Sequence, residues 1–113
     1  MSEPIKVGTV DEIDEGTAKV VPSEETGTGE DIAVFHAEDG NFYALNDECT
    51  HETASLAEGW IEGVEVECPM HSARFSLKTG EALCMPAFIA ARTHKVEVKD
   101  GEVLLFPNVN AEV

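Results

Sequence analysis

Two short segments decide how this sequence is interpreted: Cys49-Thr50-His51 and Cys68-Pro69-Met70-His71, with sixteen residues between His51 and Cys68. Each segment offers one thiolate and one imidazole, and both groups are good ligands for zinc and iron. The spacing therefore predicts a metal centre built from two separate parts of the chain. Its candidate ligands are Cys49, His51, Cys68 and His71.

The distribution of the two ligand types bears on which metal is bound. A structural zinc site usually takes two cysteines from one knuckle and two histidines from one helical turn. Here each segment mixes the types, and a Cys-x-His segment is short for placing both side chains on one tetrahedral ion. A two-iron cluster removes the difficulty, because each segment can place its cysteine on one iron and its histidine on the other. That is the ligand arrangement of a Rieske [2Fe-2S] centre.

Eight short segments have the composition of β-strands. They are rich in Val, Ile, Phe or Thr and bounded by turn residues, whereas no window of a dozen residues keeps an apolar stripe at helical spacing. The pattern predicts an all-β fold. The predicted strands span 6–10, 18–21, 32–37, 41–45, 64–68, 74–77, 94–99 and 102–106.

Turn residues add detail to this pattern. Glu38-Asp39-Gly40-Asn41 and Lys99-Asp100-Gly101-Glu102 each lie between apolar runs, so they predict tight hairpins. The polar stretch 22–31 has nothing to bury and is expected to form a mobile loop. Two irregular stretches, 46–63 and 68–72, contain the candidate ligands.

Beyond its ligand segments the chain resembles the Rieske ferredoxins. The resemblance continues through residues 32–45, through Leu77-Lys78-Thr79-Gly80-Glu81 and at Pro86-Ala87, where the family has its proline loop. It implies one domain over 1–113, a small antiparallel β-sandwich whose cluster-binding subdomain, roughly 46–86, is built from two loops. It also implies that Cys49 and Cys68 bind the inner iron, that His51 and His71 bind the outer iron near the surface, and that Pro86 helps to cover one [2Fe-2S] cluster.

Composition excludes several classes of partner. The chain has 7 Lys and Arg against 23 Asp and Glu, a formal net charge of −16. A protein that neutralises the phosphates of nucleic acid or anionic lipid needs a basic surface, so neither partner is expected. The N-terminus has no signal-peptide pattern, and no apolar run is long enough to cross a membrane. With an odd count of three cysteines, these features predict a reducing, cytoplasmic location.

The resemblance also indicates which kind of Rieske protein this is. The respiratory-chain type has a disulfide that braces the two loops, and here Ala54 and Met70 stand at those positions. High-potential members have a serine and a tyrosine two and four residues after the second histidine, where this chain has Ala73 and Phe75. Hydrogen bonds to the sulfurs favour the reduced cluster, so their absence predicts a potential at the low end of the Rieske range, about −150 to +300 mV.

These features resemble the ferredoxin component of bacterial aromatic-ring dioxygenase systems. The resemblance implies a soluble, non-catalytic electron carrier that takes single electrons from an NADH-dependent flavoprotein reductase and passes them to a terminal Rieske oxygenase. Both contacts are expected to be transient, and self-repulsion at a charge of −16 favours a monomer. The alternatives are a Rieske-like small subunit bound permanently in a larger reductase, such as nitrite reductase, and a structural zinc domain used for protein interaction.

Several conspicuous residues have an ordinary structural interpretation. Cys84 lies outside both ligand segments and is expected to be a small buried side chain. His36 and His94 fall within strand patterns and are assigned no functional role. Trp60 and Phe75 are expected to belong to the core, which is where aromatic side chains of a small β domain usually lie.

Overall fold

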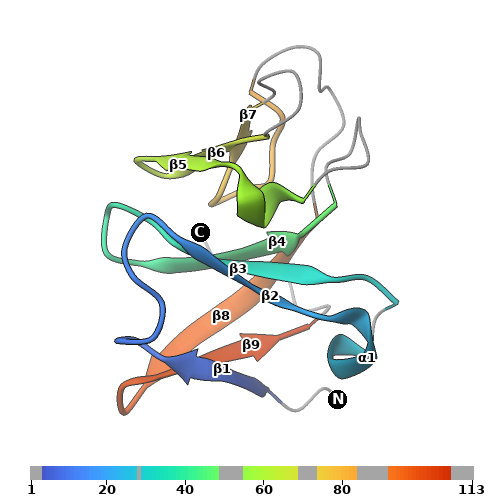
Figure 1. Cartoon of the computed structure of the whole chain (residues 1–113), viewed down its shortest axis with the longest axis vertical. Helices are drawn as coiled ribbons and strands as arrows, with labels where there is room; N and C mark the ends of the chain where they lie inside the picture. Colours follow the sequence, from blue (N-terminus) through green and yellow to red (C-terminus); the bar gives the residue numbers. More distant parts are fainter. Residues whose placement is uncertain (1–3, 28, 49–54, 69–73, 84–91, 108–113) are drawn as a thin grey trace.

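The computed structural model describes residues 4–27, 29–48, 55–68, 74–83 and 92–107. Within these ranges the chain forms strands with one turn of α-helix and one turn of 3₁₀-helix (Figure 1). The elements in chain order are β1 (Ile5–Thr9), β2 (Ala18–Val21), α1 (Ser23–Thr26), β3 (Ile32–His36), β4 (Phe42–Asn46), η1 (Leu56–Glu58), β5 (Trp60–Glu62), β6 (Glu65–Glu67), β7 (Arg74–Ser76), β8 (Thr93–Lys99) and β9 (Glu102–Phe106).

The strands form two antiparallel sheets. The larger sheet has the order β1-β9-β8-β4-β3-β2, and the small sheet has the order β5-β6-β7. In the larger sheet, β4 pairs with β8 through Ala44 opposite His94 and Leu45 opposite Thr93, and the Asn46 amide donates to the carbonyl of Arg92 at 2.9 Å. This short junction joins a half formed by β1, β9 and β8 to a half formed by β4, β3 and β2, and Figure 1 shows the small sheet beyond the second half.

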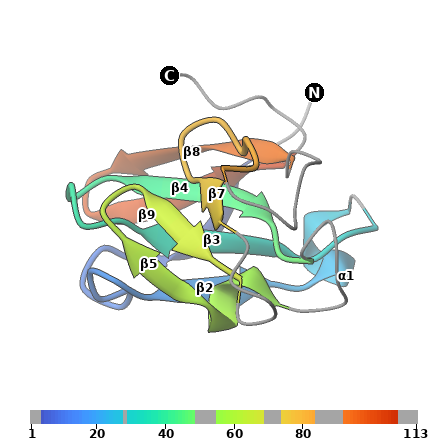
Figure 2. The same ribbon diagram turned by 90° about the horizontal axis from the view of Figure 1, so that it is seen from above.

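Strands β3 and β4 lie between two apolar clusters, which explains why their sequences carry long apolar runs. Because side chains alternate along a strand, neighbouring residues point to opposite faces. Ile32, Val34 and Ala44 pack toward β1 and β9 in one cluster. Ala33, Phe35 and Leu45 pack toward the small sheet in the other. Burial on both faces makes this pair of strands the central layer, over which the small sheet lies in Figure 2.

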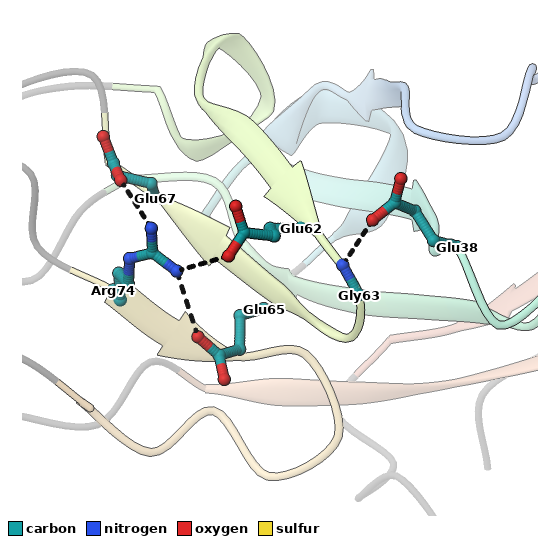
Figure 3. A network of polar contacts seen from close by, with 6 residues as sticks. All are labelled: Glu38, Glu62, Gly63, Glu65, Glu67 and Arg74. Atoms are coloured by element: carbon teal, nitrogen blue, oxygen red, sulfur yellow. Dashed lines mark hydrogen bonds and ion pairs between the residues drawn. The ribbon is translucent and has the colours of Figure 1, made fainter.

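A close backbone contact holds the small sheet together at the start of β5. A Cβ atom at Gly59 would lie 2.0 Å from the carbonyl oxygen of Glu67, so only glycine fits there without a shift. Next to this contact, Trp60 lies directly opposite Glu67 in the antiparallel register. A second connection ties the small sheet to the β3–β4 hairpin, because the Gly63 amide donates to Oε1 of Glu38 at 2.6 Å (Figure 3).

The predicted all-β fold is confirmed. All eight predicted strands exist, with ends within one residue of the prediction. Both predicted hairpins form, and at the second one Asp100 and Gly101 have φ angles of 53° and 79°, the positive values that a two-residue hairpin turn requires. His36 and His94 lie in strands β3 and β8, also as predicted.

Three expectations are wrong. The stretch 46–63 is not wholly irregular, because it contains η1 and the short strand β5. Trp60 is not a core residue: it is 61% exposed, since Ile61 takes the inward position on β5 and Trp60 therefore points outward. The stretch 22–31, expected to be a mobile loop, contains α1, and the buried Thr26 hydroxyl bonds to the carbonyl of Glu30 at 2.9 Å.

No helix in the part of the chain that the structure describes is long and apolar enough to span a membrane.

Candidate metal centre

The first ligand segment is closed at its base by backbone pairing. Glu48 and Ser55 form an antiparallel bridge across residues 49–54. Next to it, the Leu56 amide donates to the carbonyl of Asp47 at 2.7 Å. These contacts fix where the segment begins and where it ends.

The side chain of Asp47 reinforces this closure. It is buried, and it accepts hydrogen bonds from the Ser55 hydroxyl and, at 2.9 Å, from the Ala57 amide. The Asp47 amide itself donates to the carbonyl of Asp31 at 2.9 Å. Asp47 thus ties the end of β4 both to η1 and to the segment before β3.

The second ligand segment is closed by the hairpin of β6 and β7. Glu67 pairs with Arg74, so the residues between them form the connection of this hairpin. Cys68 is the first residue of that connection, and its side chain is fully buried. Of the four expected ligands, Cys68 is the one that the structure describes.

Both segment bases rest on one apolar cluster. Leu56 follows the first segment, Cys68 opens the second, and Phe75 lies on the strand after it; all three are fully buried and belong to the same cluster. The inner face of β3 and β4 supplies the rest of this floor. The bases of two segments that are separated by sixteen residues are therefore held on one apolar cluster.

A network of four charged side chains covers the outer face of the small sheet. The Arg74 guanidinium contacts Glu62 at 3.2 Å and Glu65 at 3.4 Å through Nη1, and Glu67 at 3.2 Å through Nη2 (Figure 3). The hydrogen bond to Glu62, with the charges around it, raises the pKa of Arg74 above its usual value. Arg74 ties together three carboxylates at the end of the second ligand segment.

A buried histidine supports the strand that leads to the first segment. His94 on β8 is 1% exposed, and its Nε2 donates to Oδ1 of Asn46 at 2.7 Å. Burial, and next the charge of Arg92, lowers the pKa of His94 to about 4. The ring is therefore neutral at pH 7 and acts as a hydrogen-bond donor at the end of β4.

Most of the ligand set lies outside the described residues. Cys49, His51 and His71 are in this group, together with Ala54, Met70, Ala73, Cys84 and Pro86. Among the residues described, no group of three His, Cys, Asp or Glu side chains could hold a metal ion. What the structure does describe fits an iron–sulfur cluster: a buried thiol-bearing residue opens one segment, and the bases of both segments are fixed on a common floor.

The sequence interpretation did not single out Asp47, Gly59 or Arg74. Asp47 and the glutamates around Arg74 entered only through the net charge, although no Lys or Arg lies between Lys19 and Arg74. That isolation is a usable signal, because one cation among many carboxylates has several possible partners. The role of Gly59 depends on a contact with Glu67, eight residues away, that no local pattern shows.

Comparisons with known proteins agree with this geometry. The family model of the Rieske [2Fe-2S] domain matches residues 3–99. The chain is 47% identical over 100 residues to the 3-phenylpropionate/cinnamic acid dioxygenase ferredoxin subunit of Photorhabdus laumondii, and the match covers 88% of this chain and 90% of that protein.

Solved structures give the same result. A chain in the complex of reduced oxygenase and oxidized ferredoxin of carbazole 1,9a-dioxygenase superposes with a TM-score of 0.87 at 32% identity, over 99% of this chain and 100% of that one. The ferredoxin of carbazole 1,9a-dioxygenase from Nocardioides aromaticivorans IC177 gives 0.84 at 29% identity, over 95% and 100%. A putative nitrite reductase NADPH small subunit is more distant, at 0.76 and 25%, over 92% and 98%.

The model match over most of the chain, the two closed segment bases and the buried Cys68 lead to one assignment. This chain belongs to the Rieske [2Fe-2S] domain family, and its cofactor is one Rieske-type [2Fe-2S] cluster.

Proposed function

We propose that this protein is the ferredoxin component of an aromatic-ring dioxygenase system, a one-electron carrier and not itself an enzyme. The observation that carries the proposal is the 47% identity to a dioxygenase ferredoxin subunit over nearly the full length of both chains. The superposition on the ferredoxin of carbazole 1,9a-dioxygenase supports it. The bound cluster supplies the redox chemistry by accepting and releasing one electron.

Cys49, His51, Cys68 and His71 are the proposed ligands of the cluster. Support comes from their order in the sequence and from the fixed bases of both segments, at Glu48 with Ser55 and at Glu67 with Arg74. The assignment places the two cysteines on the inner iron and the two histidines on the outer iron. The burial of Cys68 in the apolar cluster is consistent with an inner position.

The proposed electron acceptor is the terminal oxygenase of the system, and the proposed donor is a flavin-dependent NADH reductase. The complex of oxygenase and ferredoxin in the carbazole system supports the first contact. A net charge of −16 favours basic docking surfaces on both partners and speeds their encounter. We also propose that the carrier is monomeric and acts in the cytoplasm, where its cysteines stay reduced.

Electron delivery to an oxygenase tests this function. The purified holoprotein is reduced with dithionite and freed of excess reductant. It is then mixed with dioxygen, 3-phenylpropionate and the oxygenase component of the Photorhabdus laumondii 3-phenylpropionate/cinnamic acid dioxygenase. We expect the reduced protein to be reoxidised in step with product formation, at a rate that falls as salt is added. Absence of transfer in low and high salt alike would contradict the proposed function.

The alternative of a permanent small subunit in a larger reductase predicts a different result. Such a subunit would co-purify with its reductase in fixed stoichiometry, whereas a carrier that docks transiently would purify alone. The more distant match to a nitrite reductase small subunit gives no residue-level observation in favour of that alternative.

A further inference from the structure

The outer face of the small sheet carries a row of four side chains that cross all its strands at one level. Trp60 on β5 is opposite Glu67 on β6, and Glu67 is opposite Arg74 on β7. The row continues beyond β7, because Phe75 bridges Ala82 and the Leu83 amide donates to the carbonyl of Arg74 at 2.8 Å. Directly opposed residues of antiparallel strands point to the same face. We call Trp60, Glu67, Arg74 and Leu83 the outer row.

The neighbouring rows confirm this orientation. One level further along the strands, the opposed residues all pack into the apolar cluster beneath the sheet; they are Ile61, Val66, Phe75 and Ala82. Since side chains alternate along a strand, the outer row must point away from that cluster. The next outward-pointing level is mostly acidic and consists of Glu62, Glu65, Ser76 and Glu81.

Large apolar side chains at both ends distinguish the outer row. Four large hydrophobic residues are exposed in the part of the chain that is described, and two of them, Trp60 at 61% and Leu83 at 44%, stand in this one row. Single exposed apolar residues are common on protein surfaces. Trp60 and Leu83 stand in one row, three inter-strand steps or about 14 Å apart. One partner protein can therefore contact both side chains.

The middle of the row is charged and held in place. Glu67 and Arg74 form an ion pair there, and Arg74 also binds Glu62 and Glu65 (Figure 3). With Glu81, the two outward levels carry four carboxylates against one guanidinium. Arg74 holds three of these carboxylates in place. Lys or Arg side chains of a partner therefore find carboxylate acceptors that are already ordered.

The outer row also lies next to the ligand segments along the chain. Glu67 directly precedes Cys68, and Arg74 follows His71 by three residues, which limits their separation to about 11 Å along an extended chain. A protein that covers this row therefore comes close to the segment that holds two of the proposed ligands. Electron transfer requires this closeness.

We propose that the outer row is a docking surface for the terminal oxygenase, with Trp60 as its apolar anchor and Leu83 as a second contact. The inference rests on the proposed function. The complementary surface of the oxygenase is basic and apolar. It has apolar pockets for the Trp60 indole and the Leu83 side chain, and its Lys or Arg side chains face the carboxylates between and beside these two residues. Tryptophan is among the residues that most often dominate binding energy at protein interfaces. A second copy of this chain does not fit, since it would bring a further −16 of charge.

Substitutions that leave the ion-pair network intact test the proposal. Trp60→Gln and Leu83→Gln remove the apolar contacts, and Val98→Gln is the matched control, because Val98 is also exposed, at 50%, but lies on β8 in the other sheet. The holoproteins are assayed with the Photorhabdus laumondii oxygenase component described above, and the oxygenase KM for the reduced ferredoxin is measured. The reduction potential and visible circular dichroism of each variant are recorded as well.

We expect Trp60→Gln to raise the KM about tenfold or more and Leu83→Gln to raise it less, with kcat, potential and dichroism unchanged. Val98→Gln should behave as wild type. The proposal is overturned if the oxygenase KM for the double variant of Trp60 and Leu83 stays within about twofold of that for Val98→Gln. It is also overturned if these substitutions raise the KM of a reductase for this protein but leave the oxygenase KM unchanged. Failure of the wild-type protein itself to deliver electrons would instead contradict the proposed function.

Discussion

The Ser55 hydroxyl donates to the Asp47 carboxylate, whose two oxygens lie 2.8 Å and 2.7 Å from it, across the base of the first ligand segment. Because Asp47 is buried and also binds the Ala57 amide, it holds the base of the segment closed. This contact is therefore expected to affect how long the cluster stays bound as well as the stability of the fold.

Replacing Asp47 should separate the role of its shape from that of its charge. Asp47→Ala leaves the Ser55 hydroxyl and the Ala57 amide without this acceptor, at a cost of about 1–3 kcal/mol in the free energy of unfolding. Asp47→Asn keeps an acceptor oxygen and should cost less. Chemical denaturation measures the stability, and the decay of visible absorbance measures cluster loss. Equal behaviour of the two variants would contradict this role.

The proposed ligand set is tested by cysteine variants with an internal control. Cys49→Ser and Cys68→Ser should abolish the cluster and destabilise the apoprotein, because the ligand segments lose the group that joins them. Cys84→Ser should keep the full content of iron and sulfide. Iron and sulfide analysis with visible spectra decides the outcome, and a complete cluster in the Cys68 variant would refute the assignment.

Phe75 offers a test of the potential. Its side chain is fully buried in the same apolar cluster as Cys68. The resemblance to the Rieske ferredoxins places it where high-potential members have a tyrosine. Phe75→Tyr should raise the reduction potential, because a hydroxyl donor stabilises the reduced cluster. We expect a shift on the order of 50 mV, where 59 mV corresponds to a tenfold change in the equilibrium constant of a one-electron reduction.

A redox titration followed by visible circular dichroism measures that shift. The wild-type potential should lie near the bottom of the Rieske range, about −150 to +300 mV. Phe75→Leu controls for repacking, since it changes the core but adds no donor. If the tyrosine and leucine variants shift the potential equally, the hydroxyl has no specific effect.

His94 should make stability depend on pH. Its pKa is about 4 in the folded protein and about 6.5 in the unfolded chain, so between these values the unfolded state binds more protons. Stability is therefore complete above pH 6.5 and falls as the pH drops toward 4, by at most about 3 kcal/mol from this group. His94→Gln should flatten this part of the profile. Denaturation midpoints at pH 4.5 and 7 for both proteins provide the comparison, and parallel profiles would exclude the effect.

Gly59 should tolerate no side chain. In Gly59→Ala the new Cβ would lie 2.0 Å from the Glu67 carbonyl oxygen, so β5 and β6 must separate, at a cost of about 1–3 kcal/mol. Gly8→Ala is the control, because the atom nearest to its Cβ, at 3.1 Å, is the end of the flexible Glu12 side chain. Thermal unfolding of both variants checks this, and equal stability would show that the contact at Gly59 relaxes freely.

Much of the fold follows from local patterns in the sequence. The segments around Ile32 and Phe42 have alternating or continuous apolar residues, the pattern expected of strands with one or both faces buried. The Asp100-Gly101 pair supplies the positive φ angles of its hairpin turn. The candidate ligands are equally local, because the spacing of Cys49 and His51, and of Cys68 and His71, is itself the motif.

Other features depend on contacts between distant parts of the chain, which local patterns do not contain. Trp60 points outward because its neighbour Ile61 takes the inner position against the apolar cluster. Asp47 becomes a clamp only when Ser55 is brought opposite it. The sequence alone thus determined the strands, turns and metal-binding motif, since these depend on neighbouring residues. The tertiary structure decided which aromatic residue is buried and which carboxylates hold the segments, because burial and pairing depend on what the fold brings together.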